Sequence, residues 1–244
     1  MTDFLDTNDI VPTDWVPENS IIKVIGVGGG GCNAVNYMYH QHIEGCTFIV
    51  CNTDAQALNA CDVPIKIQLG EGLGAGCNPT EGRNAALNSQ EEIAEKVINS
   101  KTEMLFITAG MGGGTGTGAA PVIAAMAKKK GILTVGVVTI PFKSEGNESM
   151  SKAIDGINEI RKAIATAVRR IEIMIGSGVT AENAALLAAT GADALHFSAK
   201  QHIPSDMEYR NPRISMGGSN TVDEYSIRTV DEEEVKAILK LIKG

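Results

Sequence analysis

The sequence lacks any apolar run long enough for a transmembrane helix or a secretory signal, because its longest apolar stretches have the length of a strand and are interrupted by Lys or Gly. Positive charge is also scarce, since 21 Lys and Arg against 29 Asp and Glu leave a net charge of −8. This balance argues against nucleic acids and acidic membranes as partners. We therefore expect a soluble, cytoplasmic protein whose 244 residues can bury an ample core.

A glycine-rich stretch, Gly110–Gly118, is the most informative feature that is present. It follows the apolar run Met104–Thr108, which is typical of a buried strand, and precedes Pro121–Ala127, which is a good helix former. A strand, a glycine loop and a helix in this order place backbone N–H groups at the positive end of a helix dipole, where an anion can bind. Thr115 and Thr117 alternate with the glycines, and their hydroxyls can donate to phosphate oxygens. The stretch therefore predicts a phosphate-binding loop.

A second glycine loop lies upstream in the same context. Ile21–Val27 predicts a strand, Gly28–Gly31 a turn, and Cys32–Met38 the start of a helix. The pattern G-x-G-x-x-G is satisfied from Gly26 to Gly31, although this match is weak within four consecutive glycines. Two phosphate loops on one sheet imply a nucleotide that is held from both sides.

Several motifs in the first two thirds of the chain resemble the tubulin-like bacterial cell-division GTPase family FtsZ. The resemblance runs from about Ile21 to about Ile164 and rests on Gly26–Val35, Cys51–Leu58, Leu73–Gly76, Gly110–Pro121 and Val137–Phe142. It implies a guanine nucleotide, GTP or GDP, as the ligand, with or without Mg.

The same resemblance implies roles for individual residues. Gly29–Asn33 and Gly114–Gly116 would hold the phosphates, Ala75–Gly76 would close over the terminal phosphate, and Glu145 would face the ribose. No catalytic residue and no metal ligand is expected. The expected nucleotide contacts are Gly28, Gly29, Gly30, Gly31, Cys32, Asn33, Asn52, Ala75, Gly76, Gly112, Gly113, Gly114, Thr115, Gly116, Thr117 and Glu145.

This resemblance stops inside what should be one continuous domain. The family implies a further strand, a long central helix with base-recognition residues, and a loop of acidic residues that completes the GTPase site of a neighbouring subunit. The sequence instead continues with Ile171–Asn183 and Gly191–Ala199. Together with Tyr209–Pro212 and Asp231–Glu234, these segments are similar to the last two β/α units of the copper-homeostasis CutC family, whose members look like (β/α)8 barrels. The second resemblance covers about Arg169 to Gly244.

The segments that resemble the two families meet in the middle of the predicted sheet. This arrangement predicts an engineered chimera or a recombination product. The expected fold is α/β: a Rossmann-like open, mostly parallel sheet of the tubulin/FtsZ type, extended by two β/α units of TIM-barrel origin. Arg170–Ile175 is the expected sixth strand and Ala194–Phe197 the seventh, with the Ser177–Gly178 loop on the same rim as the phosphate loops. The expected parts are an acidic disordered tail over 1–20, a nucleotide-binding segment over 21–166, and a CutC-like segment over 167–244 within a single composite domain.

The five cysteines are Cys32, Cys46, Cys51, Cys61 and Cys77. They form no C-x-x-C pair, and their odd number argues for reduced thiols that act as small apolar residues and not as metal ligands. Cys32 and Cys77 lie within the phosphate loops. A helix N-terminus is expected to lower the pKa of a thiol there and to make it prone to oxidation.

Three further features of the second half have two interpretations each. His196 and Ser198 alternate at the carboxyl end of a predicted strand, where barrels keep their chemistry, but a hydrogen-bonded histidine and a packing serine are the better interpretation. Thr180 is expected to be a helix N-cap, although that helix start could bind a phosphate or sulfate. The glycines of Met216–Asn220 predict a mobile loop more than a third phosphate site.

One departure from the family pattern bears on affinity. Asn147–Met150 replaces the basic Gly-Lys-x-Arg that the resemblance implies, so Ser149 stands at the arginine position and Glu148 adds repulsion. A lost charge-assisted hydrogen bond costs about 1.5–3 kcal/mol, so affinity is expected to fall roughly ten- to a hundredfold. The missing central helix would also relax the selectivity for guanine.

Three functional hypotheses compete. The first is a module that binds GDP or GTP with little or no turnover, because the acidic catalytic loop is missing. The second is a residual GTPase, and the third is a purely structural engineered protein that retains no ligand. We favour the third hypothesis for what the protein was made for, and the first for the biochemical activity that it retains. FtsZ-type filaments are not expected, whereas self-association through an exposed sheet edge is a hypothesis.

Overall fold

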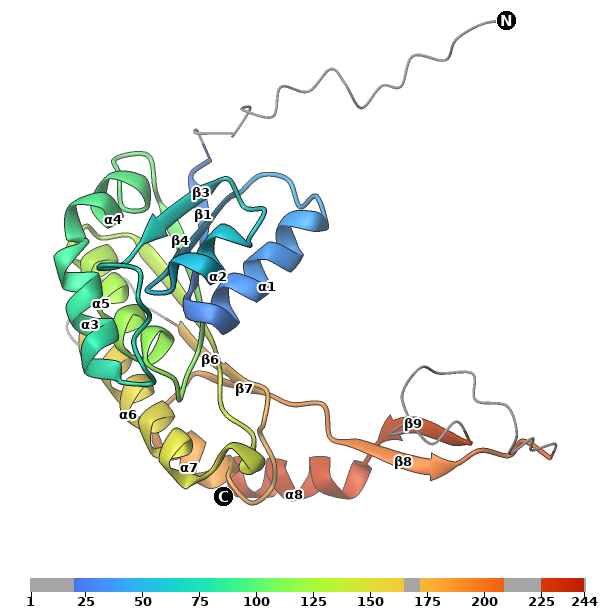
Figure 1. Ribbon diagram of the computed structural model, residues 1–244. Coiled ribbons are helices and arrows are strands. Elements are labelled where there is room, and N and C mark those ends of the chain that lie inside the picture. The colour runs from blue at the N-terminus through green and yellow to red at the C-terminus, as the bar shows by residue number, and fades with distance from the viewer. Residues whose placement is uncertain (1–19, 165–171, 209–224, 244) are drawn as a thin grey trace, which may run out of the picture.

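Seven parallel strands form one sheet in the computed structural model, which describes residues 20–164, 172–208 and 225–243 (Figure 1). The strands of this sheet are β1 (Ile22–Val27), β2 (Thr47–Asn52), β3 (Ile65–Gln68), β4 (Met104–Gly110), β5 (Leu133–Thr139), β6 (Glu172–Gly176) and β7 (Ala194–His196). A separate two-stranded sheet contains β8 (Lys200–Pro204) and β9 (Ser226–Val230). The helices are α1 (Gly28–His40), α2 (Ala55–Asn59), α3 (Pro79–Asn88), α4 (Gln90–Lys96), α5 (Thr115–Lys129), the 3₁₀ helix η2 (Lys143–Glu145), α6 (Asn147–Ile164), α7 (Ala184–Ala189) and α8 (Glu232–Lys243).

The strand order is β3-β2-β1-β4-β5-β6-β7, and every neighbouring pair is parallel. The chain runs from β1 through β2 to β3 at one edge, and then returns to place β4 on the other side of β1. The topological switch point therefore lies between β1 and β4, and open α/β sheets bind ligands beyond the carboxyl ends of the strands at such a point. The predicted α/β class with an open, mostly parallel sheet is confirmed.

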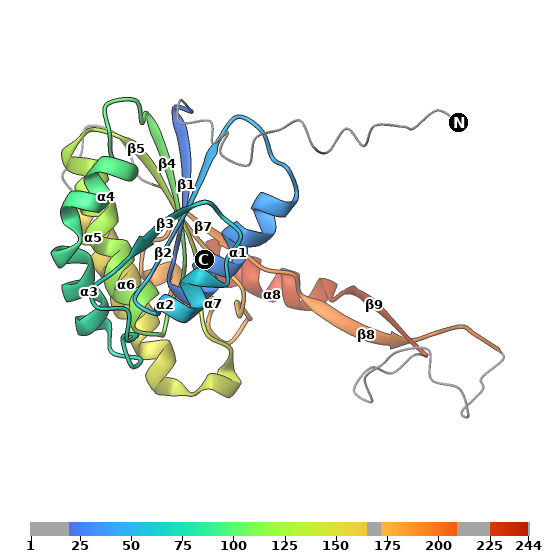
Figure 2. The ribbon, with the colours of Figure 1, turned by 45° about the horizontal axis from the view of Figure 1, so that its top comes forward.

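Helices cover both faces of the sheet but to different extents. On one face α5 packs against both α3 and α6, whereas α1 covers β1, β2 and β4 on the other (Figures 1 and 2). The larger core cluster contains Ile25, Ile107 and Ile175, and the smaller one, beneath α1, contains Val24 and Val35. Because parallel strands are covered on both faces, they read as continuous apolar runs, and β2 is buried along its whole length.

The two additional strands occupy the predicted sixth and seventh positions. β6 pairs with β5, and β7 pairs with β6. Within the described residues β6 begins at Glu172, and the predicted start at Arg170 lies outside them. β7 ends at His196, one residue before the predicted end at Phe197, so Ser198 follows the strand. His196 and Ser198 are both exposed, and Phe197 between them is half-buried.

Beyond β7 the chain leaves the main sheet. β8 and β9 form an antiparallel hairpin that projects from the body, and α8 then packs against α7 (Figures 1 and 2). Ile238 of α8 is fully buried. The acidic start of α8 was predicted, and Asp231 caps it by accepting a hydrogen bond from the Glu233 backbone N at 3.0 Å. The hairpin was not predicted.

Some predictions fall outside the described residues. These are the tail up to residue 19, the segment Tyr209–Pro212 and the glycines of Met216–Asn220. Across the three described ranges, no helix combines the length and the apolar character needed to cross a membrane.

Candidate functional site

The first glycine loop is the opening turn of α1. The helix begins at Gly28, so the predicted separate turn over Gly28–Gly31 is wrong. Glycine is required here because the backbone approaches its neighbours closely. A Cβ at Gly26 would collide with the Gly31 carbonyl oxygen, and one at Gly31 would collide with the Thr108 carbonyl oxygen. This packing places the N-terminus of α1 directly on the ends of β1 and β4.

The second glycine loop joins β4 to α5. The helix begins at Thr115, so Pro121 lies inside α5 and not at its start as the sequence suggested. Gly112 has a φ of 100°, a left-handed conformation that favours glycine. The Gly112 backbone N donates to Thr117 Oγ1 at 2.9 Å. Because Thr117 is buried, its hydroxyl braces the loop from within.

The two loops touch at the switch point. A Cβ at Gly28 would lie 2.9 Å from the backbone N of Gly116. The hydroxyls of Thr53 and Thr115 are 2.6 Å apart, which ties the start of α5 to the segment after β2. The N-termini of α1 and α5 therefore converge, and the positive ends of their dipoles favour an anion between them.

Three of the glycines predicted to contact the nucleotide present bare backbone to open space. A Cβ at Gly29, Gly76 or Gly113 would meet no heavy atom within 4 Å. We call the surface formed by Gly28–Asn33, Ala75–Gly76 and Gly112–Thr117 the cradle. The surface of the cradle that a ligand would approach consists of backbone without side chains. Backbone N–H groups can bind phosphate oxygens, so the residues present fit a chain of phosphates.

The segment Ala75–Gly76 forms the third wall of the cradle. Ala75 is buried, and a Cβ at Gly114 would lie 2.7 Å from the Ala75 Cβ. The following helix, α3, crosses α5 in backbone contact, since a Cβ at Gly118 would collide with the Pro79 carbonyl oxygen. This crossing holds the third wall beside the second glycine loop.

Two asparagines and one glutamate that were predicted to contact the nucleotide lie in different settings. Asn33 is exposed on α1. Asn52 is buried at the end of β2, where its Oδ1 accepts a hydrogen bond from the Asp54 backbone N at 3.4 Å. Glu145 is exposed, but its Oε1 accepts a hydrogen bond from the Phe142 backbone N at 2.7 Å.

The prediction of a reactive Cys32 is wrong. Cys32 is 2% exposed, and its Sγ contacts the Cys51 carbonyl oxygen at 3.4 Å. Burial, followed by the neighbouring Cys61, raises the pKa of the Cys32 thiol to about 12, so desolvation outweighs the helix dipole. Cys77 is exposed, and its φ of 58° is unusual for a residue with a side chain.

A cation that the sequence analysis missed stands beside the cradle. Lys152 Nζ lies 2.7 Å from the Glu148 carboxylate and donates to the Cys77 carbonyl oxygen at 3.2 Å. The hydrogen bond and charge of Lys152 hold the pKa of Glu148 below its ordinary value. Lys152 is three residues beyond Ser149 on α6, so the two share a helix face. Ser149 stands where the family resemblance implies an arginine. A lysine three residues further along the same helix is the sequence signal that could have identified Lys152.

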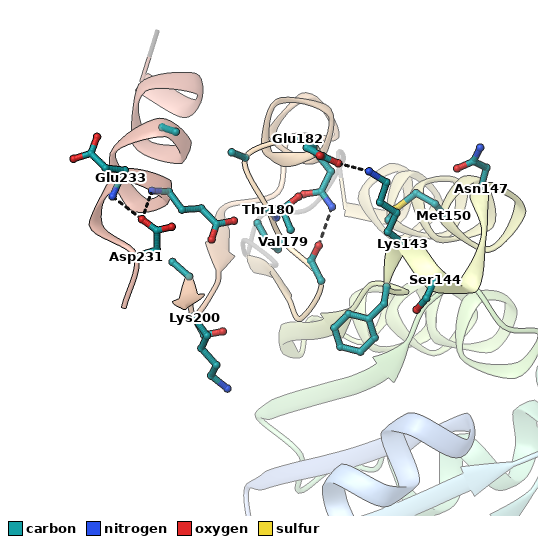
Figure 3. Close-up of a pocket in the computed structure, with 18 of the residues that line it drawn as sticks. Lys143, Ser144, Asn147, Met150, Val179, Thr180, Glu182, Lys200, Asp231 and Glu233 are labelled. Atoms are coloured by element: carbon teal, nitrogen blue, oxygen red, sulfur yellow. Dashed lines mark hydrogen bonds and ion pairs between the residues drawn. The ribbon is translucent and has the colours of Figure 1, made fainter. Parts of the chain in front are cut away.

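A cleft of about 1150 Å³ lies further along the carboxyl edge of the sheet (Figure 3). Its walls come from η2 and the start of α6, from the loop after β6, and from the start of α8. Lys143 of η2 and Glu182 of the loop form an ion pair at 2.8 Å across it. This cleft was not predicted from the sequence. The Ser177–Gly178 loop was predicted to lie on this edge, and a Cβ at Gly178 would lie 3.0 Å from the Pro141 carbonyl oxygen.

The helix that follows β6 begins at a different residue from the predicted one. The predicted N-cap Thr180 precedes the helix, which begins at Ala184 with Asn183 as its N-cap residue. Asn183 Oδ1 accepts from the Thr180 backbone N, and its Nδ2 donates to the Gly178 carbonyl oxygen, each at 2.8 Å. The asparagine side chain therefore fixes the loop. In the part of the chain that the structure describes, no group of three or more His, Cys, Asp and Glu side chains is arranged to hold a metal ion.

An open, doubly wound α/β sheet with two glycine-rich helix starts at its switch point defines the class of this protein. Residues 21–169, more than half of the chain, match the model of the Tubulin/FtsZ family, GTPase domain. The chain belongs to this family, as the sequence motifs predicted.

Individual relatives agree with this assignment. The chain is similar to the cell division protein FtsZ of Pseudomonas putida, with 50% identity over 190 residues that cover 76% of this chain and 44% of the relative. It is 45% identical to the cell division protein FtsZ of Azotobacter vinelandii over 234 residues, which cover 93% of this chain and 56% of the relative. The structure of an FtsZ dimer from M. jannaschii matches with a TM-score of 0.58 and 41% identity, over 63% of this chain and 44% of that one. The chain spans about half the length of these relatives.

The comparisons change the boundaries that we expected. An alignment of 234 residues cannot end at Ile164, so the FtsZ likeness extends further than predicted. Residues 142–201 match the CutC family, which confirms a second resemblance but places it earlier than the predicted 169–244. The two family matches overlap over 142–169, so they do not meet at a single seam.

Proposed function

We propose that the chain binds a guanine nucleotide, GDP or GTP with or without Mg, through its phosphates in the cradle. The observation that carries the proposal is that the N-termini of α1 and α5 converge on one place. The glycines there have no Cβ atom, and this leaves open space at Gly29 and Gly113. The GTPase-domain description of the matched family supports a guanine nucleotide over other polyanions.

The proposal includes binding with little or no hydrolysis. The sequence after Ile164 lacks the acidic loop that the family resemblance implies for catalysis, and no group from that part of the chain is an evident replacement. For the same reason we propose no FtsZ-type filaments. β7 is an edge strand of the main sheet, which supports self-association through that edge instead.

The proposal also includes a composite origin for the chain. The matches to two families, one over 21–169 and one over 142–201, support an engineered or recombined protein with β6 and β7 of barrel ancestry. In this interpretation residues 21–166 form the nucleotide-binding segment, and residues 167–244 extend the same body after a tail over 1–20.

The nucleotide content of the purified protein is the first test. Denaturing the protein and separating the supernatant by ion-exchange chromatography should release GDP or GTP, and calorimetric titration of the stripped protein with GDP should show one site. A protein that is empty after purification and gives no heat with GDP would contradict the proposal. It would favour the purely structural hypothesis instead.

Lys152 is proposed to bind the terminal phosphate in place of the arginine that Ser149 replaces. The residue needs only to exchange its Glu148 partner for the ligand, because it already reaches the Cys77 carbonyl oxygen beside Gly76. Lys152→Gln should weaken GTP binding about tenfold and GDP binding less, since one charge-assisted hydrogen bond is lost. Equilibrium titration with both nucleotides measures this difference.

Lys162→Gln is the matched control for Lys152→Gln. Lys162 lies on the same helix and also pairs with a glutamate, Glu159, at 2.8 Å, but it is not part of the cradle. If the two variants weaken GTP binding equally, the loss of any positive charge on α6 is sufficient for the effect. Lys152 would then have no specific role in binding the terminal phosphate.

A further inference from the structure

The hairpin of β8 and β9 stands apart from the main sheet. It projects from the body (Figures 1 and 2), and its strands pair with each other from Lys200 and Val230 to Pro204 and Ser226. A two-stranded hairpin on its own is marginally stable at best in water, and a further strand or a packed surface is needed to stabilise it. The hairpin therefore has a face that remains to be covered.

The two faces of the hairpin differ in chemistry. Ile203 and Ile227 are directly opposite each other, so they share a face, and they are 41% and 48% exposed. Lys200, His202 and Arg228 lie on the other face, because side chains alternate along a strand. β8 and β9 contain no carboxylate. The apolar face can therefore dock on a surface while the basic side chains stay in water, so docking buries no charge.

The face of the main sheet beneath α1 continues onto β5. Val24 lies in the core cluster under α1, and it pairs with Phe106 of β4. Phe106 in turn pairs with Val135 of β5, and directly paired residues lie on the same face of a sheet. The helix α1 packs against β1, β2 and β4 (Figure 2), whereas Val135 on the next strand stays half-buried.

Three side chains on β5, β6 and β7 extend this face as an accessible apolar strip. Val137 pairs with Met174, and Met174 pairs with Ala194. Val137 is half-buried, Met174 is 38% exposed, and Ala194 is exposed. We call these three residues the open strip. Because parallel sheets are normally covered on both faces, the open strip indicates that a cover is missing.

We propose that a second copy of this chain supplies the cover, with the hairpin of each copy lying on the open strip of the other. Both surfaces are incomplete within one chain and occur once in each, so a two-fold exchange completes both. The dimensions agree, because the five residues of β8 span about 17 Å and three neighbouring strands occupy about 14 Å. Charge favours the same occupant, since the hairpin strands carry only positive charge and another copy has a net charge of −8.

The exchange uses a different surface from the edge of β7. An edge contact joins two backbones through hydrogen bonds in the plane of the sheet, whereas the side chains of the open strip point out of that plane. The exchange also involves none of the residues of the cradle. Dimerisation and nucleotide binding can therefore be measured separately, and one can fail without the other.

Analytical ultracentrifugation of the full chain over a range of concentrations measures the dimer. Ile203→Lys combined with Ile227→Glu should raise the dissociation constant about a hundredfold, since each of the two contacts weakens about tenfold. Opposite charges directly across the hairpin keep its strands paired. Met174→Lys should act similarly from the open strip. Tyr37→Lys alters an exposed side chain of α1 outside both surfaces and should leave the dimer unchanged.

A mixture of the two altered chains distinguishes an exchange from other dimers. The hairpin variant keeps an unaltered open strip, and Met174→Lys keeps an unaltered hairpin. A heterodimer of the two therefore contains one intact contact. The equimolar mixture should dimerise about tenfold more tightly than either variant alone, because each homodimer has both contacts altered.

Three results would overturn the inference. A chain that stays monomeric at every concentration makes no exchange. A dimer that neither variant weakens uses another surface, such as the edge of β7. If both variants dimerise poorly and mixing restores nothing, the hairpins pair with each other and do not lie on the open strip.

Discussion

Gly118→Ala is expected to lower the free energy of unfolding by about 3 kcal/mol, because overpacking against backbone cannot be relieved by a change of rotamer. The added Cβ would collide with the Pro79 carbonyl oxygen and lie 2.6 Å from the Arg83 backbone N. Alanine is the better helix former by about 1 kcal/mol, which offsets only part of that strain. The net loss is a large fraction of the stability of a domain of this size.

Urea denaturation monitored by circular dichroism measures this difference, with Gly29→Ala as the matched control. Gly29 also lies in a helix, but a Cβ there would meet no atom within 4 Å, so its stability should be unchanged or slightly higher. If the two variants unfold at the same urea concentration, the backbone contact between α3 and α5 does not limit side-chain size. The third wall of the cradle would then need another support.

Gly113→Ala is expected to weaken GDP binding about a hundredfold without loss of stability, because the methyl group enters the space left for phosphate and displaces one or two charge-assisted hydrogen bonds. A Cβ at Gly113 would meet no heavy atom of the protein within 4 Å, so the folded chain accommodates it. Gly114 and Gly116 are poorer sites for this test. A Cβ at Gly116 would collide with the Gly110 carbonyl oxygen, and a loss of binding there would report on folding.

Calorimetric titration with GDP and thermal unfolding without ligand together test Gly113→Ala. Gly176→Ala is the control, since it adds a methyl group at the end of β6 in ordinary contact with His196, 3.7 Å away, and outside the cradle. Unchanged GDP affinity in Gly113→Ala would place the phosphates elsewhere. If the melting temperature of Gly113→Ala also falls, the loss of GDP binding comes from destabilisation of the fold and not from a clash between the methyl group and the phosphates.

The sheet could be predicted from the sequence because its strands are short apolar runs that glycine loops follow. Met104–Thr108 is the example: its residues predicted a buried strand, and the glycines after it predicted the carboxyl edge. The helix starts were less predictable. Gly28–Gly31 suggested a turn, but close packing on β1 and β4 overrides the low helix propensity of glycine.

The cradle was predictable because its chemistry lies in consecutive residues, whereas the cleft was not, because its lining comes from four separated segments. Lys152 is an intermediate case. Its distance from Glu148 follows from helix spacing, but its contact with the Cys77 carbonyl oxygen depends on how α6 packs. The prediction for Cys32 was wrong because the dipole of α1 can be inferred from sequence and the depth of burial cannot.

The position of β4 beside β1 determines when the cradle can form during synthesis. Ile22 pairs with Met104 and Val27 with Ala109, so one side of β1 has no partner strand until most of the first half of the chain has been made. Ribosomes add about 5–20 residues each second, so a nascent chain carries β1, α1 and β2 for seconds with that flank unpaired. A chain arrested after β3 would hold half of a phosphate site, and one arrested after α5 would hold both halves. A ligand of the proposed cradle could therefore assist folding only after about half of the chain has been made, when the second helix start, at Thr115, has joined the first.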